Sequence, residues 1–316
     1  MSSASVLVLD GAETAAALDP VEVLAAVRTA LVAISDDAVS APPRIFARTP
    51  AGILGCMPAF VPGVGLAAKL VSVFDAPGKD GHRGRSTHFG LVALFDETDG
   101  RPLVIMEGGR ITAVRTAAAA TLSMQALAPD PERIAIVGTG VQARAQLDLL
   151  TALGPTAEVV IGARDLVAAG TLAAGAPGTE VASIRDAVRG ADVVFCCTGA
   201  TEPVIELGWL AQRAHVSSVG GSQGHEIDAA TVSAAQVYVE WRGAADQPPP
   251  AGAHELQGLP ADRVRLIGTV LGAGTPRERD GLTLFKSTGH AAFDVAAASV
   301  VHRVALERGL GRSLDF

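Results

Sequence analysis

The hydrophobic pattern at the start of the chain predicts one helix followed by short strands. Asp19-Pro20 is typical of a helix start, and apolar residues at helical spacing follow it as far as Ile34. After that helix, short apolar runs are separated by turn residues such as Pro62-Gly63. The runs predict strands over 52–57, 66–74 and 91–95, and a further apolar run follows over 103–105. Short strands separated by tight turns are typical of an antiparallel α+β domain.

The middle of the chain has a different pattern, in which an apolar run over 134–137 leads into a glycine-rich turn and a helical segment. The turn is Gly138-Thr139-Gly140-Val141-Gln142-Ala143, a G-x-G-x-x-A spacing. Gly138 allows a sharp turn, Gly140 leaves room for a pyrophosphate at the helix N-terminus, and Ala143 lets the helix pack close to the strand. This strand, turn and helix predict a dinucleotide-binding βαβ unit.

Further apolar runs over 159–162, 193–197 and 216–220 end in small or polar residues, among them Thr198 and Gly220. Ligands of a doubly wound sheet lie beyond the carboxyl ends of its strands, so these ends are candidate cofactor contacts. Two long helices complete the pattern, one over 111–127 and one over 291–308.

Composition and charge exclude several classes of partner. The chain has 316 residues, enough for two domains, and a net charge of −8 gives no indication of nucleic acid or an anionic membrane as partner. It has no run long enough to span a membrane and no secretory signal, so we expect a soluble, cytoplasmic protein. Cys56, Cys196 and Cys197 lack metal-ligand spacing, so we expect neither a disulfide framework nor a metal site.

The end of the second Rossmann strand indicates the cofactor. An NAD enzyme usually has a carboxylate there to bind the ribose hydroxyls, but this strand ends Ile161-Gly162-Ala163-Arg164-Asp165. Arg164 could bind a 2′-phosphate, which favours NADP(H). NAD(H) stays possible if Arg164 is a solvated loop residue and Asp165 binds the ribose.

Four basic residues are further site candidates: Arg44, Lys69, Arg115 and Lys286. Lys69 lies in the otherwise apolar run 66–74, on one strand face with Val71 and Val73. Apolar neighbours favour a cleft, although a solvated lysine at a sheet edge fits the pattern as well. A buried ammonium has a lowered pKa and could exchange protons near neutral pH.

Arg115 lies in the first turns of the predicted helix 111–127, where a cation opposes the helix dipole. That position suggests a bound anion, either a substrate carboxylate or a cofactor phosphate. Arg44 follows two prolines and is ambiguous by itself.

Several motifs, in order, resemble the ornithine cyclodeaminase/μ-crystallin family, and together they span nearly the whole chain. They are Met57-Pro58-Ala59, Lys69 in its strand, Leu94-Phe-Asp-Glu-Thr-Asp-Gly100-Arg-Pro102, Ile111-Thr-Ala-Val-Arg115-Thr116-Ala-Ala, Val137-Gly-Thr-Gly-Val-Gln142-Ala143, and Leu284-Phe-Lys286-Ser287-Thr-Gly289 through Asp294. The R-T-A-A and G-x-G-x-Q-A elements in this order are specific.

The resemblance implies an α/β fold, with a Rossmann doubly wound domain inserted into a discontinuous α+β substrate-binding and dimerisation domain. We expect the dinucleotide-binding domain over 119–288 and the substrate and dimerisation domain over 1–118 plus 289–316. A homodimer is implied as well.

The resemblance also implies roles for single residues. Arg44, Lys69 and Arg115 would hold the carboxylate and the amino or imino group of a small amino-acid or imine substrate, and hydride would pass between the nicotinamide and its α-carbon. The expected cofactor contacts are Thr116, Gly138, Thr139, Gly140, Val141, Gln142, Ala143, Arg164, Thr198, Gly220 and Ser287.

One departure from the family pattern bears on the reaction. Ser222 stands where a true cyclodeaminase is expected to have the aspartate that acts as acid and base in amine loss and ring closure. A serine hydroxyl cannot take that role near neutral pH. His225 or Glu226 could replace it, although Glu226 better matches a structural position.

Three functions therefore stay open. The leading hypothesis is an NAD(P)-dependent imine or ketimine reductase or amino-acid dehydrogenase. The alternative is a cyclodeaminase of ornithine or a related diamino acid that releases ammonia. The third is a non-catalytic NADP(H)-dependent binding protein, which would not need Lys69 and both arginines.

Overall fold

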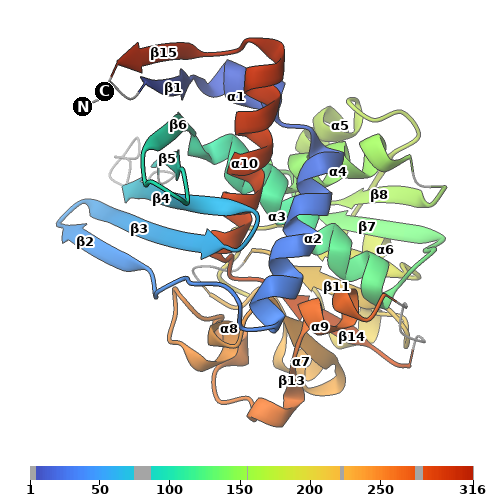
Figure 1. Ribbon diagram of the computed structural model, residues 1–316. Coiled ribbons are helices and arrows are strands. Elements are labelled where there is room, and N and C mark those ends of the chain that lie inside the picture. The colour runs from blue at the N-terminus through green and yellow to red at the C-terminus, as the bar shows by residue number, and fades with distance from the viewer. Residues whose placement is uncertain (1–4, 75–86, 155, 221–223, 275–279, 316) are drawn as a thin grey trace. The chain divides into compact units, whose positions relative to one another are not determined.

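The computed structural model describes residues 5–74, 87–154, 156–220, 224–274 and 280–315. The chain forms two compact units (Figure 1). Unit 1 consists of residues 1–33, 37–115 and 291–316, and unit 2 of residues 34–36 and 116–290. Among the described residues, no helix is both long enough and apolar enough to cross a bilayer.

Unit 1 contains, in its described part, a seven-stranded sheet with the order β15-β1-β6-β5-β4-β3-β2. The strands are β1 (Ser5–Leu9), β2 (Ile45–Thr49), β3 (Gly52–Val61), β4 (Gly65–Phe74), β5 (Thr87–Phe95), β6 (Pro102–Glu107) and β15 (Arg312–Asp315). The three predicted strands are confirmed within β3, β4 and β5, and the apolar run 103–105 lies in β6. The expected antiparallel arrangement holds for neighbours from β2 to β6 and for β1 with β15, but β1 pairs with β6 in parallel.

Four helices begin in the described part of unit 1. They are α1 (Gly11–Ala17), α2 (Pro20–Ser35), α3 (Gly108–Leu127) and α10 (Ala291–Arg308). Helix α2 begins where Asp19-Pro20 predicted, since the Asp19 carboxylate accepts hydrogen bonds from the backbone N–H groups of Val21 and Glu22. Helix α3 continues into unit 2 from Thr116 onward.

Helix α10 packs against β3, β4 and β5 within unit 1 (Figure 1). Met57, Lys69 and Val92 are partners in register on these three strands, and all three are buried. Paired residues of neighbouring strands share a face, so Lys69 lies in an apolar row on one face of the sheet.

The opposite face of these strands is apolar and exposed. One row of partners in register on this face runs from Ile45 through Cys56 and Leu70 to Leu91. In the next row, Ser72 pairs with both Leu54 and Phe89. We call Ile45, Leu54, Phe89 and Leu91 the outer face. Its side chains are exposed, Ile45 by 67% and Phe89 by 70%.

Unit 2 contains, over the described residues, an eight-stranded sheet with the order β13-β12-β14-β11-β10-β7-β8-β9, and its neighbours pair in parallel. The strands are β7 (Arg133–Val137), β8 (Glu158–Gly162), β9 (Glu180–Ala182), β10 (Val193–Cys196), β11 (His215–Ser218), β12 (Gln236–Val239), β13 (Val264–Leu266) and β14 (Thr283–Lys286). The expected α/β fold class with a doubly wound sheet is confirmed.

The helices of unit 2 connect these strands. They are α4 (Val141–Leu153), α5 (Leu166–Ala173), α6 (Ile184–Val188), α7 (Ala229–Ala234), α8 (Gly243–Asp246) and α9 (Ile267–Gly272), with short 3-10 helices η2 (Leu207–Trp209), η3 (His254–Leu256) and η4 (Ala261–Arg263).

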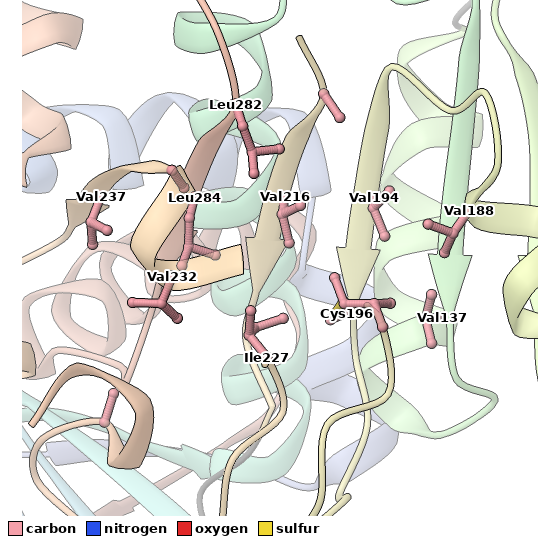
Figure 2. Close-up of a cluster of buried hydrophobic side chains, with 14 of the residues drawn as sticks. Val137, Val188, Val194, Cys196, Val216, Ile227, Val232, Val237, Leu282 and Leu284 are labelled. Carbon is pink, nitrogen blue, oxygen red and sulfur yellow. The ribbon is translucent and has the colours of Figure 1, made fainter. Parts of the chain in front are cut away.

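Apolar clusters lie on both faces of the unit 2 sheet. Val137, Val194, Val216 and Leu284 project from neighbouring strands into one cluster, shown in Figure 2. The alternate residues of β7 and β10, such as Ile136 and Phe195, belong to a second cluster. Burial of both faces explains the unbroken apolar runs of these strands in the sequence.

Candidate functional site

A buried ionic cluster lies in unit 1. The Lys69 ammonium donates hydrogen bonds to Thr112 Oγ1 at 2.5 Å and to Asp294 Oδ1 at 3.1 Å. Arg115 Nε donates to the same Oδ1 atom at 3.3 Å. The three charged residues are 4%, 6% and 1% exposed, in the order Lys69, Arg115, Asp294. Strand β4, helix α3 and helix α10 thus each contribute one charged side chain.

The electrostatics of this cluster set the protonation of Lys69. Burial lowers the pKa of Lys69 below its ordinary value of 10.5; the Asp294 carboxylate opposes this effect, and the guanidinium groups of Arg115 and Arg44 add to it. Burial also works to raise the pKa of Asp294, but the two cations outweigh it and hold that pKa below its ordinary value. We therefore treat Asp294 as ionised and Lys69 as an ammonium that gives up its proton more readily than a surface lysine.

The structure changes the interpretation of Arg115. Helix α3 begins at Gly108, three residues earlier than expected, so Arg115 lies two turns inside the helix and the dipole argument for a bound anion is wrong. The anion beside it is Asp294 of the chain itself. Arg44 lies just before β2 and acts electrostatically on Lys69, which places it in the same region.

The predicted glycine turn lies at the carboxyl end of β7 in unit 2. Gly138 has φ 118°, and a Cβ there would lie 2.8 Å from the carbonyl oxygen of Cys197, so glycine is required for the turn. Gly140 has φ −83°, and a Cβ there would meet nothing within 4 Å. No side chain caps the N-terminus of α4 at Gly140, so its free N–H groups have room for a pyrophosphate.

The neighbouring strand end contains Arg164 and Asp165. Asp165 caps α5, because its Oδ1 atom accepts hydrogen bonds from the backbone N–H groups of Val167 and Ala168. Arg164 is exposed. The close packing of α6 explains why residue 162 is a glycine, since a Cβ there would lie 2.9 Å from the Cβ of Ala187.

A buried carboxylate, that of Glu226, ties together two further strand ends. Its Oε1 accepts from the backbone N–H and the hydroxyl of Thr198, at 2.7 and 2.6 Å. Its Oε2 accepts from the Ser218 hydroxyl at 2.7 Å and from the Gly220 N–H at 3.0 Å. A Cβ at Gly220 would collide with Thr198 and Glu226. Glu226 thus fixes the ends of β10 and β11, and both its oxygens are occupied.

Lys286, one of the four basic candidates, belongs to this buried network and not to the cluster of unit 1. Its ammonium pairs with Glu255 Oε1 at 3.0 Å and donates to Ser218 Oγ and the Gly220 carbonyl, both at 2.9 Å. These three partners satisfy its donors, so its role is structural.

Glu240 is fully buried after β12 and binds the segment that follows β14. Its Oε1 accepts from the Thr288 N–H at 2.8 Å and from the Ser287 hydroxyl at 3.2 Å. Burial raises the pKa of Glu240 above its ordinary value of 4.5, although these hydrogen bonds oppose the effect. Ser287, an expected cofactor contact, is thus 4% exposed and held by Glu240.

Sequence reasoning did not assign roles to Asp294, Glu240 or Glu255. Each is a lone acid beside apolar residues, and that pattern is the signal by which the sequence indicates a buried acid. Ser222, the departure from the cyclodeaminase pattern, lies outside the described residues. Among the residues that are described, no three His, Cys, Asp or Glu side chains form a group that could hold a metal ion.

Comparisons with known proteins identify the family of the chain. The model of the ornithine cyclodeaminase/mu-crystallin family matches residues 6–309. Ketimine reductase mu-crystallin from Mus musculus is 34% identical over 259 residues, 79% of this chain and 80% of that protein. Delta(1)-pyrroline-2-carboxylate reductase from Paracoccus denitrificans is 32% identical over 276 residues, 82% of this chain and 86% of that protein.

A solved structure is similar over almost the whole chain. It is Thermococcus litoralis Delta(1)-pyrroline-2-carboxylate reductase in complex with NADH and L-proline, with a TM-score of 0.84 and 27% sequence identity. The similarity covers 98% of this chain and 100% of that one.

The raised pKa of Glu240 predicts a pH-dependent effect of Glu240→Gln on stability. As pH rises above about 4.5, the unfolded chain ionises this carboxyl before the folded chain does, so the wild type loses stability that the variant keeps. The variant should therefore gain in free energy of unfolding relative to the wild type as pH increases. Urea unfolding at several pH values measures this.

The exposed Glu202 in the same unit provides the control, since Glu202→Gln should show no such trend. A difference between Glu240→Gln and the wild type that stays constant with pH would contradict the assignment.

Proposed function

This chain belongs to the ornithine cyclodeaminase/mu-crystallin family, and on that premise we propose that it reduces the C=N bond of a small 2-imino acid. It is an oxidoreductase that uses a nicotinamide cofactor. The relatives described above are named for ketimine and pyrroline-2-carboxylate reduction, which supports an imine substrate with a neighbouring carboxylate.

The observation that best supports the proposal is the buried Lys69 ammonium beside Arg115 and within the field of Arg44. Arginine binds carboxylates well, because its planar donors match the two oxygens. A buried lysine with a lowered pKa can donate a proton at a useful rate near neutral pH. Unit 1 therefore combines the two functions that a 2-imino acid requires.

In the proposed reaction, Arg44 and Arg115 bind the substrate carboxylate. Arg115 Nε is bonded to Asp294, so the terminal nitrogens of its guanidinium are the part offered to the substrate. Lys69 transfers a proton to the imine nitrogen, which makes the α-carbon a better hydride acceptor. The nicotinamide supplies the hydride to that carbon. Lys69 then regains its proton from water.

Unit 2 is the proposed dinucleotide-binding domain, and unit 1 the substrate-binding and dimerisation domain. The glycine turn accommodates the pyrophosphate, as the open space at Gly140 allows, and Thr116, Thr198, Gly220 and Ser287 belong to the same proposed binding region. NADP(H) is the favoured cofactor, because Asp165 is engaged in capping α5 while Arg164 is exposed beside it.

The cyclodeaminase alternative is weakened by Glu226. Its two oxygens accept four hydrogen bonds, so it cannot serve as the acid and base that Ser222 lacks. His225 is exposed, with its ring 5.9 Å from that of His254, and is the remaining candidate for that role.

We infer that two copies of the chain associate through the outer face of the unit 1 sheet. Its row of exposed apolar side chains from β2, β3 and β5 is unlike the surface of a monomer. An interface that joins identical faces by a two-fold axis is the commonest arrangement of a homodimer.

The central test is a panel of cyclic 2-imino acids, and of 2-oxo acids with amines, assayed with NADPH and NADH. We expect oxidation of the cofactor with a cyclic 2-imino acid. Lys69→Ala should lower kcat/KM about 10²- to 10⁴-fold, as for loss of a general acid. Lys69→Arg should be almost as impaired, because arginine keeps the charge but cannot release a proton.

Arg110, exposed on the same helix as Arg115, provides a control, and Arg110→Ala should leave the rate unchanged. Full activity of Lys69→Ala would exclude the proposed proton transfer. Release of ammonia from ornithine without net change in cofactor absorbance would instead favour the cyclodeaminase.

A second prediction concerns the cofactor. Arg164→Ala should raise the KM for NADPH about 10- to 100-fold, because the loss of a hydrogen bond to a charged group weakens binding by about that factor. The KM for NADH should stay unchanged. Gly140→Ala is the matched control, since a methyl group in the pyrophosphate site should weaken both cofactors without affecting folding. Equal weakening of both cofactors by Arg164→Ala would contradict the 2′-phosphate contact.

A third prediction concerns assembly. Sedimentation should show a dimer for the wild type, and Phe89→Glu should weaken dimerisation about tenfold or more, because it buries a charge in an apolar interface. Val167 is 81% exposed in unit 2, and Val167→Glu should leave the dimer intact. A Phe89→Glu chain that dimerises as the wild type does would place the interface elsewhere.

A further inference from the structure

We propose that Asp294 is a positioning residue of the imine-reducing site, whose Oδ1 atom fixes the Lys69 ammonium and the Arg115 guanidinium at a set spacing. The proposal rests on the function proposed above, in which Lys69 protonates the substrate nitrogen and Arg115 binds the carboxylate. The two cations lie 3.1 and 3.3 Å from this one oxygen.

The geometry of Asp294 is not that of an ion pair arranged for stability. Aspartate–arginine pairs are frequently bidentate, with two parallel hydrogen bonds that use both carboxylate oxygens. Here both cations bind Oδ1, and Oδ2 is buried with no hydrogen-bond partner among the described residues. A buried charge with an unsatisfied oxygen costs free energy, so stability does not explain this arrangement.

A shared oxygen does explain a site for a 2-imino acid. The nitrogen and the carboxylate of such a substrate are attached to the same carbon, so the proton donor and the carboxylate-binding group must be close neighbours. Two cations that are close neighbours repel each other, and the attraction of an anion to both offsets that repulsion. Asp294 Oδ1 lies within ion-pair distance of both, which meets that requirement.

Asp294 also keeps the proton on Lys69 until the substrate binds. Burial, Arg115 and Arg44 all lower the pKa of Lys69, and Asp294 is the carboxylate that raises it. Transfer to the imine moves one proton, and one positive charge, from Lys69 to the substrate nitrogen. Hydride addition at the α-carbon converts the iminium to an amine, and Lys69 takes up a proton from water.

Thr112 offers a matched comparison. It accepts a hydrogen bond from Lys69 at 2.5 Å and donates its own hydroxyl hydrogen to the Gly108 carbonyl at 2.7 Å. Thr112 therefore holds the same ammonium without any charge. Thr112→Val removes one hydrogen bond from Lys69, whereas Asp294→Asn removes a negative charge at nearly constant volume.

The direct test is an NMR titration of Lys69. Lysine occurs three times in the sequence, at positions 69, 79 and 286, so a chain labelled at lysine Cε gives a simple spectrum. The signal that is missing in Lys69→Arg is that of Lys69. We expect a wild-type ammonium that is still charged at neutral pH. Asp294→Asn should lower the pKa of Lys69 by about one unit or more, with a smaller shift for Thr112→Val and an intermediate one for Asp294→Glu.

The kinetic test is the pH profile of imine reduction. Reduction needs protonated Lys69, so the rate should fall at alkaline pH about tenfold for each pH unit above the pKa of Lys69. In Asp294→Asn this fall should begin at a lower pH, by the pKa shift that NMR measures. Ser299 lies on the same helix and donates to the Val64 carbonyl at 2.7 Å; Ser299→Ala should leave the profile unchanged. If the role of Asp294 were merely structural, Asp294→Asn would lower the rate by the same factor at every pH.

The two proposals fail in different ways. An unshifted Lys69 in Asp294→Asn, or a wild-type Lys69 that is neutral at neutral pH, overturns the role of Asp294 even if imines are reduced. A shifted Lys69 in a chain that reduces none of the imines overturns the proposed function and leaves the role of Asp294 in holding Lys69 intact. Should Asp294→Asn fail to fold, the wild-type titration and Asp294→Glu decide.

Discussion

One carboxylate oxygen, Asp294 Oδ1, is the atom on which the buried ionic cluster of unit 1 depends. It joins side chains from β4, α3 and α10 inside an apolar region, where each of these charges alone would be too costly to bury. Mutual attraction offsets that cost only while all three are present. The cluster therefore requires the strand, both helices and their register to form together.

Unit 2 uses the same physical device in another way. At the strand ends of a parallel sheet some backbone N–H groups have no partner on a neighbouring strand, and a buried carboxylate can accept their hydrogen bonds. Glu226 does this for Thr198 and Gly220, while Glu240 does it for Thr288. In both units a buried acid fixes the geometry of the groups around it.

The features that the sequence predicted well are those with local causes. The steric needs of a glycine turn explain why Gly138 could be identified, and strand periodicity explains why Lys69 was placed in an apolar row. The pairing of Lys69 with Asp294 joins residues 225 positions apart, and no local pattern encodes it. The sequence indicates a site cation at Lys286, because it does not show that Glu255 lies beside this lysine.

Errors at element ends had larger consequences than their size suggests. Helix α3 begins three residues before the predicted start, and this small difference removes the helix-dipole argument for an anion at Arg115. The parallel pairing of β1 with β6 was missed because short turns between apolar runs indicate only antiparallel neighbours. The exact start of a helix and the pairing partner of a strand are both set by backbone hydrogen bonds, which the pattern of side chains does not show.

The number of groups free to move a proton limits the reaction that the chain can perform. Glu226 is saturated with donors, Glu255 is paired with Lys286, and Asp294 is held between two cations. Within the unit 1 cluster, Lys69 is the charged group whose pKa burial lowers. One proton and one hydride suffice to reduce an imine, whereas amine loss with ring closure needs a second acid–base group. Among the described residues the buried acids are therefore engaged, which supports imine reduction over cyclodeamination and leaves exposed His225 as the candidate for a second acid–base group.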